Sequence, residues 1–154
     1  MANDPLEVKA NEALAEADKL ANRGVEVETT SEGRRLYTKA ATLFKVAKNF
    51  TEAGRAYVKS AEFVIASEED SWKLSAGGDY EAAADCFKKA AQPEIALHCL
   101  EKAADRYLYY GWIEWVGQCH LRMAQLQESE RQLQQAIDQY DRAADFFLIK
   151  YRHR

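Results

Sequence analysis

Two pairs of adjacent cysteine and histidine residues are the part of this sequence that could bind a metal ion. The pairs are His98–Cys99 and Cys119–His120, and both residue types are common zinc ligands. Adjacent residues on a helix point about 100° apart, so neither pair can chelate one ion as residues four apart do. Cys99 and Cys119 also occupy equivalent places in two copies of a sequence repeat, where a small apolar residue packs. We therefore predict buried, reduced thiols and no metal site.

Signatures of catalysis are absent from the sequence. It contains no phosphate-binding glycine loop, nucleophile elbow or zinc-protease motif. Nothing in it suggests the base and the positive surroundings that a thiol nucleophile needs. Three cysteines, an odd number, each lie in a helical pattern, which is typical of a reducing compartment. We predict a cytoplasmic protein with no enzymatic activity, no cofactor and no small-molecule substrate.

Basic and aromatic side chains gather where helices are expected to end. Lys45 and Lys48 follow one predicted helix, and Lys88 and Lys89 end another. One explanation for these lysines is that cations stabilise helix C-termini. The other is that these corners align along one edge and form a basic stripe for an acidic partner.

The segment RYLYYGWIEW is the most aromatic of the chain, and we predict that its Trp112, beside a glycine, is an exposed anchor for a partner.

Composition and charge limit the class of protein further. The net charge of −4 argues against general nucleic-acid binding. No apolar run reaches the ~18 residues of a membrane span, and the N-terminus lacks the apolar core of a signal peptide. Only two prolines and seven glycines interrupt a chain rich in good helix formers, and no alternating strand pattern is present. We expect an all-α protein with one domain over residues 1–154, at most peripheral to membranes.

A short pattern, first seen as YTKAATLF, repeats along the chain. Clear copies begin at Tyr37, Tyr57, Leu100, His120 and Tyr140. The regular spacing of 20 residues predicts a further copy near position 80, and YEAAADCF at Tyr80 fits it, whereas FKKAA at Phe87 is out of register. Each unit is one helix of about four turns with a short corner. Paired units form hairpins, which predicts a right-handed, tetratricopeptide-like α-solenoid of about seven helices.

Capping signals predict where these helices begin and end. We expect helices from Pro5, capped by Asp4, to Gly24; from Ser31 to the corner KNFT; from Thr51, as N-cap, to Ser67; from about Asp70 to Ala91; from Pro93 to Gly111; from Ile113 to Ser129; and from about Arg131 into the basic tail. A break in the fourth helix at Gly77–Gly78 is an open alternative.

With this register, two long segments resemble the SNAP family, the soluble NSF attachment proteins, and most of all the alpha type. They are LYTKAATLFKVAKNFTEAGRAYVKSAE and CFKKAAQPEIALHCLEKAADRYLYYG. The most specific part is F-K-x-A-K-N-x-x-x-A-G-x-A-Y, which ends at Tyr57. The resemblance implies a curved sheet of helical hairpins that binds a SNARE coiled-coil bundle and recruits the ATPase NSF, which unwinds it. It also implies that basic residues contact the acidic bundle, and the matching positions include Lys45, Lys48, Lys88 and Lys89.

The sequence departs from the family pattern in three ways. Family members are longer, and their C-terminal part, which engages the ATPase, has no counterpart here, so we expect no activation of an NSF-like enzyme. The loop that inserts into membranes in the alpha type has only Val25 and Val27 as apolar residues, so we expect no insertion. Basic family positions fall on Trp112 and Gln118, which weakens the basic stripe there.

A structural or self-assembling scaffold is the alternative function. The last predicted helix has no following helix to cover it, so we expect its apolar end to need a second chain, as in a homodimer. The residues concerned are Phe146, Phe147, Leu148 and Ile149.

Overall fold

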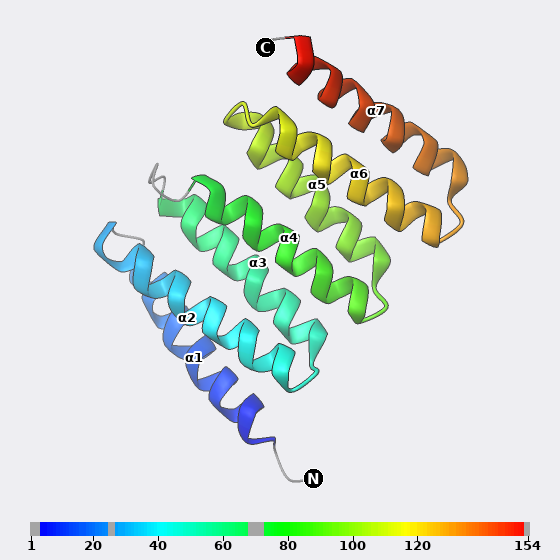
Figure 1. The fold of residues 1–154 in the computed structure, drawn as a ribbon. Coiled ribbons are helices and arrows are strands. Elements are labelled where there is room, and N and C mark those ends of the chain that lie inside the picture. The colour runs from blue at the N-terminus through cyan, green and yellow to red at the C-terminus, as the bar shows by residue number, and fades with distance from the viewer. Residues whose placement is uncertain (1–3, 25–26, 68–72, 153–154) are drawn as a thin grey trace.

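A computed structural model describes residues 4–24, 27–67 and 73–152, and these form seven α-helices joined by short corners (Figure 1). The helices are α1 (Pro5–Asn22), α2 (Val27–Val46), α3 (Phe50–Ser67), α4 (Lys73–Lys89), α5 (Pro93–Tyr109), α6 (Ile113–Ser129) and α7 (Leu133–Arg152).

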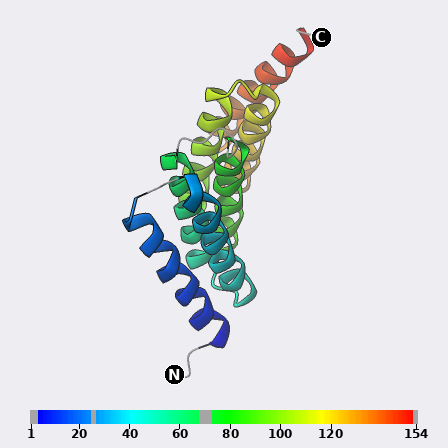
Figure 2. The ribbon, with the colours of Figure 1, turned by 90° about the vertical axis from the view of Figure 1, so that its left-hand side faces the viewer.

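The helices stack as antiparallel hairpins, each packed against the next along the chain. In Figure 1, α2, α4 and α6 form the front layer, with α1, α3 and α5 behind them, and the two termini lie at opposite ends. Seen edge-on, the stack is narrow and leans steadily from one end to the other (Figure 2). The prediction of an all-α solenoid of helical hairpins is therefore confirmed.

Four of the corners share one backbone conformation, which tests the register of the repeat. Lys48, Ala91, Gly111 and Arg131 all have positive φ, and each lies 11 residues after the start of a repeat copy. The amide of the following residue donates to the carbonyl five residues earlier, as in a Schellman motif. These hydrogen bonds are Asn49 to Phe44, Gln92 to Phe87, Trp112 to Tyr107 and Gln132 to Gln127, at 2.8 to 2.9 Å. The common geometry confirms the copy at Tyr80.

The layer between the helices is filled by small residues and aromatic rings. The repeat alanines Ala40, Ala61, Ala83 and Ala103 are buried, which lets the helix backbones approach closely. At four places a ring lies directly on a glycine of the preceding helix, where an added Cβ would lie 2.2 to 3.0 Å from the ring. The pairs are Gly33–Phe63, Gly54–Phe87, Gly77–Tyr107 and Gly117–Phe147. This packing explains why α4 is not broken at Gly77–Gly78.

Some helix bounds differ from the prediction. The second helix begins at Val27 rather than Ser31, and Thr30 in its first turn is fully buried, so packing outweighs the low helix propensity of threonine. Asn49, not Thr51, is the N-cap of α3, because its side-chain oxygen accepts from the amide of Glu52 at 3.3 Å.

The ends of α4 and the start of α7 also differ. The fourth helix ends at Lys89 because Ala91 adopts the left-handed corner conformation. The predicted start of this helix at Asp70 lies outside the described residues. The last helix begins at Leu133, since Arg131 takes the same corner conformation.

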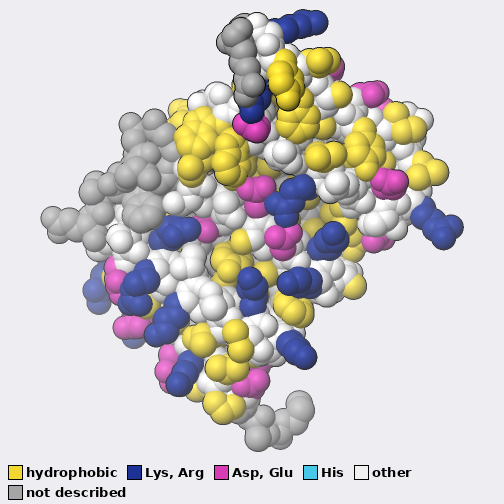
Figure 3. All heavy atoms as spheres, viewed as in Figure 1, with side chains coloured by type: hydrophobic (Ala, Val, Ile, Leu, Met, Phe, Trp, Pro, Cys, Tyr) yellow, Lys and Arg dark blue, Asp and Glu magenta, His cyan; other side chains and the backbone are white. Residues whose placement is uncertain are grey.

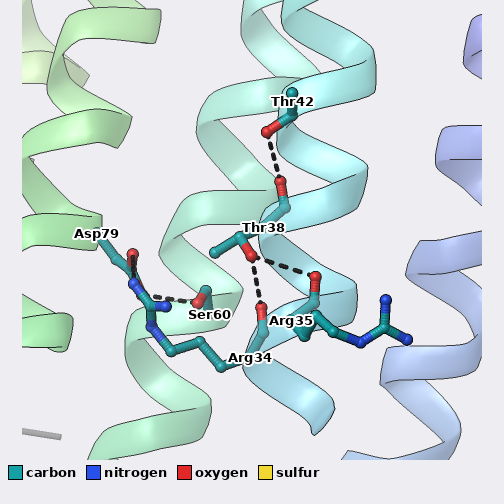
Figure 4. A network of polar contacts seen from close by, with 6 residues as sticks. All are labelled: Arg34, Arg35, Thr38, Thr42, Ser60 and Asp79. Carbon is teal, nitrogen blue, oxygen red and sulfur yellow. Dashed lines mark hydrogen bonds and ion pairs between the residues drawn. The ribbon is translucent and has the colours of Figure 1, made fainter. Parts of the chain in front are cut away.

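Polar contacts tie together helices that are not neighbours in the chain (Figure 4). The buried Asp79 of α4 accepts a hydrogen bond from the Ser60 hydroxyl of α3 at 2.7 Å and one from the Arg34 guanidinium of α2 at 3.1 Å. Burial raises the pKa of Asp79, while Ser60 and Arg34 act to lower it. The first two hairpins are thus linked through one carboxylate.

A second type of link spans three consecutive helices. Glu81 of α4 accepts from the Tyr107 hydroxyl of α5 at 2.7 Å and from the Arg122 guanidinium of α6 at 2.9 Å. In the same arrangement, Asp18 of α1 accepts from Tyr37 of α2 and Lys59 of α3. Each of these contacts joins three helices of the stack through one carboxylate.

Candidate protein-binding surface

The three cysteines lie in the core, as the sequence predicted. Cys86, Cys99 and Cys119 are buried free thiols. Burial raises the pKa of Cys99 to about 11 and that of Cys119 to about 12, so neither is a thiolate at neutral pH. Among the described residues, no group of three or more His, Cys, Asp or Glu side chains is placed to bind a metal ion.

Lys48 and Lys89 come together at one edge of the stack. They line a surface depression of about 470 Å³ between the α2–α3 corner and the α4–α5 corner. Phe50, the first residue of α3, also lines it, and the Lys89 ammonium lies 5.5 Å from the centre of its ring. Glu7 of α1 contributes the acidic group of the depression and accepts a hydrogen bond from the Asn49 side chain at 3.1 Å.

Lys45 lies on the side of this edge formed by α2 and α4. Its ammonium is 5.9 Å from the centre of the Tyr57 ring. Burial raises the pKa of the Cys86 thiol, and the nearby Lys45 and Lys89 charges partly oppose that rise. Both lysines are therefore close to the same point of α4, although they are far apart in the sequence.

Lys88 points away from the other three lysines. It lines a small hollow between α4 and α6, beside Arg122 and Asp85. Consecutive residues on a helix diverge by about 100°, so Lys88 and Lys89 face different neighbours. The structure thus brings together Lys45, Lys48 and Lys89, which we call the edge lysines, and separates Lys88 from them.

The edge lysines and Lys88 make no ion pair within the part of the chain that the structure describes. Other cations, such as Arg55 and Lys59, are paired with carboxylates. On the face formed by α2 and α4, Lys and Arg side chains are spread over the lower half of the view, with acidic side chains among them mainly at the lower left (Figure 3). This edge can therefore offer its positive charge to a partner.

Trp112 is less exposed than the sequence predicted. Trp112 is partly buried and packs against the core, because as the residue before α6 it folds back over the hairpin. The exposed aromatic side chains nearby are Tyr109, with 76% of its surface exposed, and Trp115, with 46%. A large apolar cluster is visible at the α5–α6 corner, at the upper left of Figure 3.

The sequence analysis did not predict a role for Phe50. Phe50 follows the corner asparagine directly, and an aromatic residue at that place was a signal for a ring beside the corner lysines. Within the described ranges, none of the helices is long and apolar enough to cross a membrane.

The fold and this surface define a class: a helical-repeat solenoid with an open basic edge, suited to extended contacts with a protein partner. Comparison with known proteins narrows the class. Residues 8–151 match the family model described as "Soluble NSF attachment protein, SNAP". The chain belongs to this family, as the sequence motifs indicated.

Individual relatives agree with this assignment. The chain is 37% identical over 111 residues to an alpha-soluble NSF attachment protein of Vitis vinifera, covering 72% of this chain and 37% of the relative. It is 30% identical over 156 residues to a beta-soluble NSF attachment protein of Bos taurus, covering 96% of this chain and 51% of the relative. The chain thus spans about half the length, or less, of these relatives.

A solved structure supports the fold. The crystal structure of BtubC (BKLC) from P. vanneervenii superposes with a TM-score of 0.62, at 18% identity, over 94% of this chain and 58% of that one. At this identity the likeness concerns the architecture.

Proposed function

We propose that this chain is a non-enzymatic adaptor that binds an acidic coiled-coil bundle of the SNARE type through its basic edge, in membrane-fusion traffic. Lys45, Lys48 and Lys89 form the centre of the contact, with Lys88 toward its border. Trp112, at the α5–α6 corner on the opposite edge of the stack, is a separate point of contact. The function belongs to the cytoplasm or to the membrane surface facing it. Membership of the SNAP family supports the kind of partner.

One observation carries this proposal. Lysines from two separate corners converge around Phe50 at one edge, and none of them makes an ion pair with the described residues. Unpaired cations on a rigid edge favour an elongated acidic partner, because each contributes a weak contact without first breaking an internal pair. Phe50 and Tyr57 supply apolar surface between the charges.

The test is binding of an assembled four-helix SNARE bundle, measured by anisotropy at low and raised salt. We expect binding to weaken with salt, and Lys48→Glu or Lys89→Glu to weaken it by about tenfold each. Lys88→Glu is expected to have a smaller effect because Lys88 faces α6.

Lys19→Glu is the matched control, since it makes the same charge change on α1, far from the edge lysines. Binding that is insensitive to salt, or that is equally weakened by Lys19→Glu and Lys89→Glu, would contradict the proposal.

Self-association through α7 is a second candidate, favoured by a specific observation. Phe146 and Phe147, expected to be uncovered, pack against α6 instead: Phe146 stacks on His120 at 5.4 Å, and Phe147 lies on Gly117. A different stripe of α7 remains open to solvent, and it consists of Leu133, Ile137, Leu148 and Tyr151. Such a stripe on a terminal helix suits a second copy of the chain.

A further inference from the structure

A second surface feature is a groove of about 410 Å³ between α3 and α5, with α4 as its base, and it meets the depression of the edge lysines at Thr51. Its apolar lining comes from all three helices. These residues are Val58, Tyr80, Phe87, Ile95 and Cys99. Ile95 is 45% exposed, so it offers apolar surface to an occupant of the groove.

The charged residues that line this groove, and its one histidine, are all of basic types. They are Arg55 and Lys59 on α3, and His98 and Lys102 on α5. No Asp or Glu is among the described residues that line it. In a chain whose net charge is −4, such a one-sided lining favours an acidic occupant.

The carboxylates that already lie beside these basic residues can be replaced by carboxylates of an occupant. Arg55 pairs with Glu52 at 3.0 Å, Lys59 pairs with Asp18 at 3.2 Å, and His98 lies 3.6 Å from the Glu101 carboxylate; all six side chains are about one-third exposed or more. Surface pairs of this kind contribute little to stability. The Lys102 ammonium lies 5.6 Å from the centre of the Tyr80 ring, where it partly covers the apolar base of the groove.

The spacing of the lining residues fits a helical occupant. On α3 they are at positions 51, 55, 58 and 59, and on α5 at 95, 98, 99 and 102, which is one face of each helix. Two walls of this length, roughly 12 Å at 1.5 Å per residue, match two turns of a third helix. An amphipathic helix inserts apolar side chains at i, i+3 and i+4 between such walls.

A buried polar atom at one end of the groove also lacks a partner. The side-chain oxygen of Gln92, which lines the groove, is buried and makes no hydrogen bond with the described residues. An unpaired buried acceptor is costly, and a donor from an occupant would satisfy it.

We propose that this groove is a docking site for an acidic, amphipathic helical segment of a partner protein. Apolar side chains of the segment enter between Val58 and Ile95, and its carboxylates face Lys59 and Lys102. The groove lies on the layer of α3 and α5, whereas Lys45 and Lys89 converge beside Cys86 of α4. The two surfaces meet at Thr51 but have no charged lining residue in common, so charge reversals test them separately.

The test begins with the full chain, immobilised and used to select from a displayed library of helical peptides of about 16 residues. Selected peptides are then measured by anisotropy against the wild-type chain and its variants. We expect enrichment of sequences with Leu, Ile or Phe at i and i+3 or i+4 flanked by Asp and Glu. Ile95→Glu and Lys102→Glu are each expected to weaken their binding by about tenfold or more.

Two controls make the result specific. Ile137→Glu changes a similarly exposed aliphatic residue on α7 and should leave peptide binding unchanged. Lys48→Glu should also leave it unchanged, while weakening the binding of a SNARE bundle. Failure to enrich any peptide, enrichment of basic peptides, or undiminished binding to Ile95→Glu in a folded variant (checked by circular dichroism) would overturn the docking site, whatever the outcome for the edge lysines.

Discussion

Asp79 shows how a single carboxylate can link two helical hairpins. It is the only charged side chain that is buried among the described residues. One of its oxygens accepts a hydrogen bond from Ser60, and the other accepts one from Arg34. Burial is the largest influence on its pKa and raises it. The folded state therefore binds the Asp79 proton more tightly than the unfolded chain does.

This difference predicts the pH dependence of stability. A group whose pKa is raised on folding adds stability at low pH, and that contribution is lost as the pH rises from the ordinary value of 3.8 through the raised value. We expect the free energy of unfolding of the wild type, relative to Asp79→Asn, to fall over this window. Urea denaturation at a series of pH values measures it, with Asp145→Asn, an exposed site, as the control. A difference that grows with pH would contradict this account.

The hairpin corners give a prediction about the backbone. Ala91 has a φ of 57°, a conformation that costs an alanine about 1 kcal/mol or more relative to glycine. Ala91→Gly is therefore expected to raise the free energy of unfolding by about 0.5 kcal/mol, after the greater flexibility of the unfolded chain is subtracted.

The opposite substitution, from glycine to alanine, can be made at the equivalent corner residue Gly111. Its φ is 76°, so Gly111→Ala is expected to destabilise the chain by about 1 kcal/mol. Both variants are measured by thermal and urea denaturation, and a stabilising Gly111→Ala would show that the shared corner geometry does not govern stability.

Among the helices, α4 is the one in which helix propensity and packing make opposite demands. Its two adjacent glycines weaken it as an isolated helix, yet it is continuous because Gly77 receives the Tyr107 ring of α5. The same ring donates its hydroxyl to Glu81 on α4. The α4–α5 pairing therefore depends on the absence of a side chain at Gly77.

Adjacent alanine substitutions separate these two effects. A Cβ at Gly77 would lie 2.5 Å from the Tyr107 ring, whereas one at Gly78 would meet nothing within 4 Å. We expect Gly77→Ala to lower the free energy of unfolding by about 1–3 kcal/mol, and Gly78→Ala to raise it by about 0.5–1 kcal/mol. Because helix propensity improves equally in both, the difference measured by urea denaturation reports the ring contact. Equal effects would show that the ring can move away at no cost.

For the whole molecule, the exposed stripe of α7 predicts concentration-dependent assembly. Leu133 and Ile137 are 62% and 52% exposed on a helix with no further helix of the described chain on its outer side. We expect the mass measured by light scattering to rise with concentration, and Ile137→Asp to keep the chain monomeric. Val46→Asp, on α2, is the control and should not affect assembly. A wild-type chain that stays monomeric at high concentration would exclude this interface.

The sequence alone determined the number of helices, their approximate bounds and the register of the repeat. These features depend on neighbours within one or two helical turns: the pattern of alanines and aromatics at i, i+4 and i+7, and the cap residues at each corner. The buried cysteines followed from the same periodicity. The start of α2 could not be predicted in this way, because Thr30 is helical only through its burial against other helices.

Only the tertiary structure decided which surface residues lie together. The sequence placed Lys88 and Lys89 in one group, but a rotation of about 100° between neighbours turns Lys88 toward α6 and leaves Lys89 with Phe50 and Lys48. Likewise, Trp112 appeared to be exposed at a corner, yet the chain folds it against the core. Such groupings depend on how helices distant in the sequence pack across their layers, and local periodicity contains no information about that packing.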